Sequence, residues 1–424
     1  MVESAAGVPP AALRRRLGMF DAVVIGLGAM IGAGIFSALA PAAHAAGSGL
    51  LPGLGLAAVV AYCNATSSAR LAARYPASGG TYVYGRERLG DFWGYLAGWG
   101  FVVGKIASCA AIALTVGLYA WPGQAHAVAV AAVVALTAVN YLGIEKSALL
   151  TRVIVAAVLA VLALVVVATL GWGATDATRL DVGTDTTVGG VLQAAGLLFF
   201  AFAGYARIAT LGEEVRDPAR TIPRAIPLAL GIALGVYAAV AVAVLLVLGP
   251  QRLADAAAPL SDAVHAAGMP QLEPVVRAGA AVAALGSLLA LILGVSRTTL
   301  AMARDRHLPH ALATVHPRFK VPHRAELAVG AVVAVLAATA DLRSAIGFSS
   351  FGVLVYYAIA NASAWTLSPA ENRPPRIIPV LGFAGCVTLA VTLPISSVVA
   401  GAAVLAAGVA AYAIRHAVTG RRRR

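Results

Sequence analysis

The chain has 424 residues, of which 60% are apolar and only 12% are charged, about half the charged share of an ordinary globular protein. One or two soluble cores could not bury so much apolar surface, which excludes a soluble enzyme, a disordered chain and a disulfide scaffold. The composition predicts an all-α polytopic membrane protein, and the net charge of +13 is attributed first to membrane topology.

Residues 1–19 are interpreted as a cytoplasmic tail, because the apolar run after Arg14, Arg15 and Arg16 is too long for a signal peptide. A helix that crosses a bilayer needs about 20 mostly apolar residues. Twelve runs approach that length, the ninth being short. The predicted spans are 20–42, 50–73, 91–119, 124–142, 150–171, 189–210, 225–248, 275–301, 326–340, 345–367, 377–394 and 396–414.

The positive charges segregate when these spans are threaded alternately through a membrane. Of the 31 Lys and Arg residues, 26 fall on the side that holds both ends of the chain, four fall on the other side, and Lys105 lies inside the third span. Because Lys and Arg collect in cytoplasmic loops, the pattern predicts twelve helices with both termini in the cytoplasm. The basic tail, residues 415–424, is interpreted as a topology anchor or a contact with anionic lipid.

Glycines are concentrated in the middle of the first span, at Gly26, Gly28, Gly32 and Gly34. Each glycine inside a helix costs ~1 kcal/mol relative to alanine, so four within nine residues need a reason. One reason is close packing against another helix. The other is a break in the helix, at which freed backbone N–H groups bind a carboxylate.

Five segments, in order along the chain, resemble signature segments of the amino acid–polyamine–organocation (APC) transporters. They are Met30–Phe36, Pro76–Tyr82, Phe199–Tyr205, Glu213–Pro218 with Thr221–Arg224, and Ser296–Arg297 and Ala303–Asp305 with Leu308–Pro309. The resemblance implies the LeuT-type fold: two five-helix repeats of inverted topology, residues 20–171 and 189–367, an outer loop at 172–188, two further helices at 368–414, and the tail. The residues support it independently, because spans 1 and 6 hold corresponding places and both carry glycine-containing interruptions.

The same resemblance implies a substrate site at the two interruptions. The backbone N–H groups of Gly32, Ala33 and Gly34 would hold a carboxylate, and the carbonyl groups of three residues in span 6 would hold an ammonium group. Phe202 and Tyr205 would be gate or pocket rings, or packing rings of the helix. The full set of expected substrate-binding residues is Ile31, Gly32, Ala33, Gly34, Phe200, Ala201, Phe202, Ala203, Gly204 and Tyr205.

Three further residues are candidates for coupling or gating. Lys105 either faces the bundle interior, where it would carry or sense a proton, or snorkels to an interface. Arg207 pairs with Glu213 or Glu214 in a cytoplasmic gate, or simply follows the positive-inside rule. Ser287 joins carbonyl groups of span 1 in a sodium site, or bonds its own helix backbone.

The spans hold no acidic side chain at mid-depth, so a second ammonium group on the substrate would be left unpaired. We therefore predict a secondary transporter for neutral, zwitterionic amino acids. An acidic substrate becomes an option if Lys105 faces the site. A polyamine, organocation or amine transporter and a non-transporting substrate sensor are the alternatives.

The sequence contains no clustered groups typical of an enzyme, a metal site or a cofactor site, and the coupling ion is expected to be H⁺ or Na⁺. The expected partners are a small amino acid and the lipid bilayer, with no nucleic acid; the oligomeric state stays open. Frequent Ala, Arg and Val indicate a GC-rich genome, which favours a bacterial inner membrane.

Overall fold

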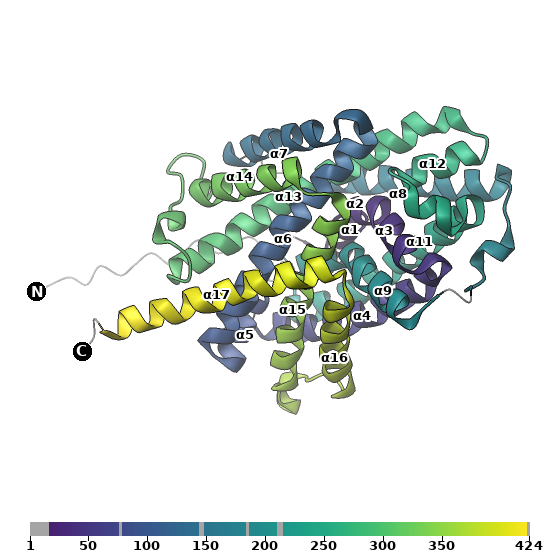
Figure 1. The fold of residues 1–424 in the computed structure, drawn as a ribbon. Coiled ribbons are helices and arrows are strands. Elements are labelled where there is room, and N and C mark those ends of the chain that lie inside the picture. Colours follow the sequence, from purple (N-terminus) through teal and green to yellow (C-terminus); the bar gives the residue numbers. More distant parts are fainter. Residues whose placement is uncertain (1–16, 76–78, 144–147, 184–185, 210–214, 422–424) are drawn as a thin grey trace, which may run out of the picture.

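The computed structural model describes residues 17–75, 79–143, 148–183, 186–209 and 215–421. Within these ranges the regular structure is helical (Figure 1), with a single isolated bridge between Leu17 and Val215 and no strand. The predicted all-α class is confirmed.

The helices divide into two groups along the chain. The first group comprises α1 (Met19–Met30), α2 (Ala33–Ser37), α3 (Leu39–Ala46), α4 (Leu50–Arg74), α5 (Thr81–Leu89), α6 (Asp91–Ala120), α7 (Ala125–Tyr141) and α8 (Ala148–Trp172). The second comprises α9 (Val188–Phe202), the 3₁₀ turn η4 (Ala203–Tyr205), α10 (Ala206–Ala209), α11 (Pro218–Asp255), α12 (Pro259–Ala266), α13 (Glu273–Arg304), α14 (His323–Thr339), α15 (Leu342–Trp365), α16 (Ile377–Thr392) and α17 (Ile395–Arg421).

Helices occupy all twelve predicted runs, and ten helices in the described part are long and apolar enough to cross a membrane. α7 reaches that length only together with the 3₁₀ turn at Pro122–Gln124, which makes a span of 20 residues. The two runs that fall short are α14, with 17 residues, and α16, with 16. The helix of the seventh predicted span, α11, begins at Pro218 rather than near residue 225. Proline is well tolerated in the first turn of a helix, and the polar residues that follow it can stay helical outside the bilayer. Two short helices, α5 and α12, lie outside the apolar runs and were not predicted.

One end of the bundle, which we call the basic end, is held together by contacts between segments far apart in sequence. The guanidinium of Arg152 in α8 lies 2.5 Å from the carboxylate of Asp21 in α1, and that of Arg86 in α5 lies 2.7 Å from Asp305, just beyond α13. Arg88 and Arg74 both contact Glu371, in the turn after α15. The backbone N–H of Ser368 and then the guanidinium of Arg88 lower the pKa of Glu371 to about 2.

The opposite end uses backbone carbonyl groups for its long-range contacts. Arg179 donates to the carbonyl of Leu246 at 2.9 Å, and Ser48 donates to the carbonyl of Arg179 at 2.8 Å. Arg277, at the start of α13, donates to the carbonyl of Tyr119 at 3.2 Å. These contacts join segments that the sequence analysis places on the same side of the membrane.

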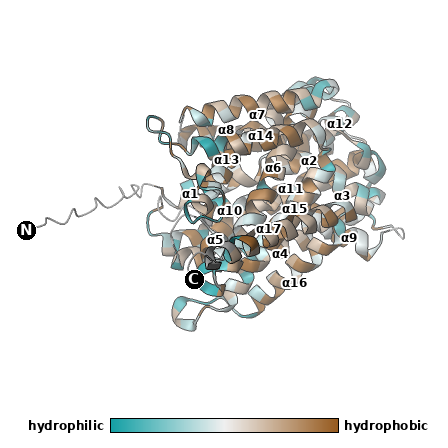
Figure 2. Cartoon of the chain, turned by 60° about the vertical axis from the view of Figure 1, so that its left-hand side comes forward, coloured by the Kyte–Doolittle hydropathy of each residue, from teal (hydrophilic) through white to brown (hydrophobic). Residues whose placement is uncertain are grey.

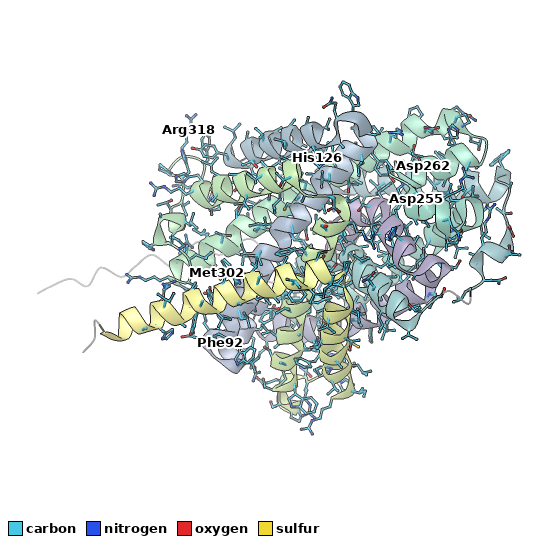
Figure 3. All side chains as sticks on the ribbon, in the orientation of Figure 1. Phe92, His126, Asp255, Asp262, Met302 and Arg318 are labelled. Carbon is cyan, nitrogen blue, oxygen red and sulfur yellow. The ribbon has the colours of Figure 1, made fainter. Side chains whose placement is uncertain are left out.

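Polar residues gather at the two ends, and the helix middles between them are apolar (Figure 2). Large side chains such as Val399, Val391 and Leu170 are at least 48% exposed on α17, α16 and α8. Figure 3 places Arg318 toward the basic end and Asp255 and Asp262 toward the opposite end. An apolar belt with polar ends is the surface that a lipid bilayer solvates.

Candidate functional site

The first predicted span is broken in its middle. α1 ends at Met30, the N–H of Ile31 still donates to the carbonyl of Leu27 at 2.7 Å, and Gly32 leaves the helical conformation at φ −85° and ψ −129° before α2 begins at Ala33. A Cβ on Gly32 would lie 2.8 Å from Cβ of Ser287, and closer still to its hydroxyl. Glycine is therefore required by packing as well as by the break, so both readings of the glycine cluster hold at this position.

The second interruption is a tightening of the helix rather than a gap. α9 ends at Phe202, the next three residues form the 3₁₀ turn η4, and α10 continues from Ala206. Such a turn changes which carbonyl groups are satisfied inside the helix. The interruption predicted within Phe199–Tyr205 is thus found at residues 203–205, and the carbonyl group of Ala203 faces a protein donor.

The two interruptions cross each other at backbone distance. A Cβ on Gly34 would lie 2.6 Å from Cα of Ala201, and a Cβ on Gly204 would lie 2.6 Å from the backbone nitrogen of Met30. Small residues on both helices thus allow the break in α1 to touch the turn η4. The structure brings the two halves of the predicted site together.

Lys105 lies in the middle of α6 and is only 6% exposed. Its Nζ atom is 3.5 Å from the carbonyl oxygen of Ala203 in η4. The side chain therefore faces the bundle interior and reaches the second interruption; it does not snorkel to an interface. Ala203 is one of the residues whose carbonyl group was expected to bind the substrate's ammonium group.

A tyrosine missed by the sequence analysis links the two interruptions. The hydroxyl of Tyr237, in α11, lies 2.6 Å from the carbonyl oxygen of Met30 and 3.0 Å from that of Ala201. One hydroxyl has one hydrogen, so it serves these two acceptors alternately. The available signal was a tyrosine inside an apolar span, since a buried phenol usually finds a hydrogen-bond partner.

The aromatic side chains of span 6 are buried in ring contacts. Phe202 packs on Tyr237 with ring centroids 5.1 Å apart, and Tyr205 packs on Tyr357 of α15 at 5.2 Å. Both side chains are fully buried and Phe200 is 9% exposed. In this structure the rings pack the helices around the crossing.

The remaining candidates are placed as follows. Ser287 of α13 donates to the carbonyl of Gly28 in α1 at 3.2 Å, so it bonds a span-1 carbonyl and not its own helix. Arg207 is partly buried in α10, but Glu213 and Glu214, its expected partners, lie outside the described residues. The described residues contain no group of His, Cys, Asp or Glu that could hold a metal ion.

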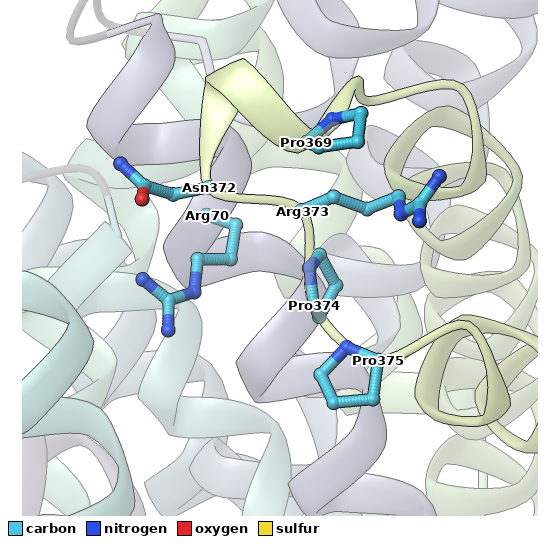
Figure 4. Close-up of a pocket in the computed structure, with 6 residues that line it drawn as sticks. All are labelled: Arg70, Pro369, Asn372, Arg373, Pro374 and Pro375. Carbon is cyan, nitrogen blue, oxygen red and sulfur yellow. The ribbon is translucent and has the colours of Figure 1, made fainter.

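A surface pocket of about 400 Å³ lies at the basic end, apart from the crossing (Figure 4). It is formed by Arg70, near the end of α4, and by the proline-containing turn at residues 369–375. Apart from Arg70, its lining residues belong to the loop that carries Glu371, and none of them lies in an interrupted helix. The candidate substrate site is therefore the buried crossing and not this pocket.

Comparison with known proteins gives concordant matches. Residues 17–414 match the family model described as amino acid permease. An "uncharacterized transporter" of Mycobacterium tuberculosis is 79% identical over 98% of this chain and 94% of its own length. A branched-chain amino acid permease of Bacillus subtilis is 27% identical over 90% of this chain and 88% of its own length. The human cationic amino acid transporter 4 is 30% identical over 86% of this chain and 61% of its own length.

Proposed function

Because this chain belongs to the amino acid permease family, within the APC superfamily, we propose that it is a secondary transporter that moves amino acids by alternating access. It is a multi-pass membrane permease and not an enzyme. The observation that carries the proposal is the crossing of the two interrupted helices, which puts irregular backbone from both halves at one buried point. Irregular backbone at membrane depth is tolerated only where protein or a cavity covers it.

The proposed topology has twelve spans in a bacterial inner membrane, with the basic end on the cytoplasmic side. The ten helices that meet the length criterion, together with α14 and α16, make up the twelve. The concentration of Arg and Lys at the end that carries the start of α1 and the end of α17 supports a cytoplasmic location for both termini.

The proposed inverted repeats, residues 20–171 and 189–367, are supported by matching helices. α6 and α13 have 30 and 32 residues, α7 and α14 have 17 each, and α8 and α15 have 25 and 24. In four cases the proposed counterparts also pack against each other: the two interrupted spans, α4 with α11, α6 with α13, and α7 with α14. Contacts between counterparts are expected when two repeats are related by a pseudo-two-fold axis.

The proposed substrate is a neutral, zwitterionic amino acid. Its carboxylate would bind backbone N–H groups of Gly32, Ala33 and Gly34, and its ammonium group would bind carbonyl groups of Phe200, Ala201 and Ala203. Ile31, Phe202, Gly204 and Tyr205 would complete the site. Within the described residues no carboxylate side chain forms an ion pair with Lys105, so a second cationic group on the substrate would have no counter-charge there.

The proposal is tested by thermal unfolding of the purified chain in detergent, with L-alanine, L-leucine, L-glutamate, L-lysine and spermidine as ligands. A ligand that binds only the folded state at 100 times its Kd stabilises it by about 2.7 kcal/mol. We expect L-alanine or L-leucine to raise the apparent Tm. The same assay with and without Na⁺, and at several pH values, identifies the coupling ion.

Uptake into proteoliposomes then separates the alternatives. Exchange of external labelled amino acid for internal unlabelled amino acid supports a transporter. Binding without exchange would indicate a substrate sensor, and stabilisation by spermidine alone would indicate an organocation transporter. Either result would refute the proposed function.

A further inference from the structure

Lys105 is a cation that lies where the proposed function puts the substrate's own cation. Its Nζ atom is within 3.5 Å of the carbonyl oxygen of Ala203, and its side chain is almost fully buried. A second nearby acceptor, the carbonyl of Ala201, already has the hydroxyl of Tyr237 at 3.0 Å. Two of the three carbonyl groups expected to bind ammonium therefore have protein donors in this structure.

The surroundings of Lys105 offer nothing to neutralise a second positive charge. In the part of the chain that the structure describes, the titratable neighbour of Lys105 on α6 is the buried thiol of Cys109, one turn further along the helix. The carboxylates on helices packed against α6 are Glu87 of α5, Glu273 of α13 and Glu326 of α14, all in terminal turns. Nearby η4 and α15 contribute the phenols of Tyr205, Tyr356 and Tyr357.

We propose that protonated Lys105 and the substrate's ammonium group exclude each other at the carbonyl of Ala203, so that each bound zwitterion releases one proton. Two ammonium groups at one carbonyl would repel strongly in a site sheltered from water. When Lys105 gives its proton to the water in the open pathway, the repulsion disappears. Neutral Nζ then has a lone pair, which accepts a hydrogen bond from the substrate's ammonium group.

This exclusion makes the chain an antiporter, which exchanges an amino acid for a proton. The inference rests on the proposed function. A protein that holds either a proton or a substrate, but not both, carries the two in opposite directions across the membrane. By linkage, substrate affinity must rise with pH wherever Lys105 is protonated in the free protein. The expected change in Kd is up to about tenfold per pH unit.

The test measures proton release on ligand binding, with purified protein in weakly buffered detergent solution, a pH-indicating dye and starting pH values between about 6 and 9. L-leucine is compared with 4-methylpentanoate, which keeps the carboxylate and the side chain but lacks the amine. We expect L-leucine to release up to one proton for each molecule bound, and 4-methylpentanoate to release none. Both ligands are applied to the unaltered chain, so the comparison does not depend on a variant's folding.

Two variants assign the proton to its residue. Lys105→Met should bind L-leucine without proton release and with a Kd independent of pH. Lys320→Met, which removes an exposed lysine from the loop between α13 and α14, should release protons as the unaltered chain does.

The outcomes are distinguishable. L-leucine binding without proton release, or with proton uptake, would overturn the exclusion but leave the proposed function standing. Tight binding of L-glutamate that is lost in Lys105→Met, without proton release, would also overturn it, because Lys105 would then be a carboxylate receptor. If no amino acid binds the folded chain at any pH, the proposed function fails and the inference fails with it.

Discussion

Replacing Gly204 by alanine tests whether the crossing of the interrupted helices is built on backbone contact. A Cβ at this position would lie 2.6 Å from the backbone nitrogen of Met30 and closer still to the carbonyl of Ala29, whereas ordinary contacts begin near 3.4 Å. These neighbours are backbone atoms and cannot rotate away. α1 and η4 must separate, and overpacking of this kind costs about 1–3 kcal/mol.

The expected effect is a fall in the apparent Tm in detergent of roughly 1–3 °C, together with loss of amino acid exchange in proteoliposomes. The matched control is Gly294→Ala in α13, because a Cβ there would have no neighbour within 4 Å. An added methyl at that open helical position should leave Tm unchanged or raise it slightly. If Gly204→Ala and Gly294→Ala behave alike in both assays, the crossing is not a tight backbone contact and the reasoning is refuted.

Three further predictions concern contacts around the site and at the basic end. Gly32→Ala should lower Tm, and adding Ser287→Gly to it should restore Tm, with a coupling energy of about 1–2 kcal/mol in a double-mutant cycle. Additive effects of the two substitutions would contradict the contact between Gly32 and Ser287. Tyr237→Phe leaves buried carbonyl groups without their donor and should cost about 1–3 kcal/mol, whereas Tyr62→Phe, at a residue 47% exposed, should change little. The pKa of Glu371 is lowered from 4.5 to about 2, so its carboxylate stabilises the fold fully above pH 4.5 and loses that effect as the pH falls toward 2. The difference in Tm between the unaltered chain and Glu371→Gln should therefore disappear as the pH falls through that interval. A difference that stays constant with pH would argue against an ionic role.

The positions of the long helices were predictable because a lipid-exposed helix must be apolar over its whole length, and that length can be counted. The short helices α5 and α12 were not, since Thr81–Leu89 and Pro259–Ala266 lie outside the apolar runs and fold against their neighbours. The break at Gly32 was predictable as one of two interpretations of the glycine cluster. The form of the interruption in span 6 was not predictable, because composition does not distinguish a 3₁₀ turn from a gap in the helix.

The direction in which a side chain points was the least predictable property. α6 is apolar on nearly all sides, so no stripe of hydrophobic residues indicates which face Lys105 occupies. The contact between Tyr237 and Met30 joins residues 207 positions apart, and only the folded arrangement reveals it. Sequence reasoning could identify Lys105 as an ionisable group in a span, but its contact with Ala203 depends on how three helices pack.

The segments at each end of the bundle are held together by a different kind of contact. The two ends should therefore respond differently to the salt concentration and pH of the solution. Contacts between distant segments at the basic end are ion pairs, such as Arg86 with Asp305 and Arg152 with Asp21, which salt screens and acid removes. Those at the opposite end run from Arg179 and Arg277 to peptide carbonyl groups, which do not titrate. Under the proposed alternating access, high salt or low pH should act mainly on the contacts of the basic end and should favour the opening of that end.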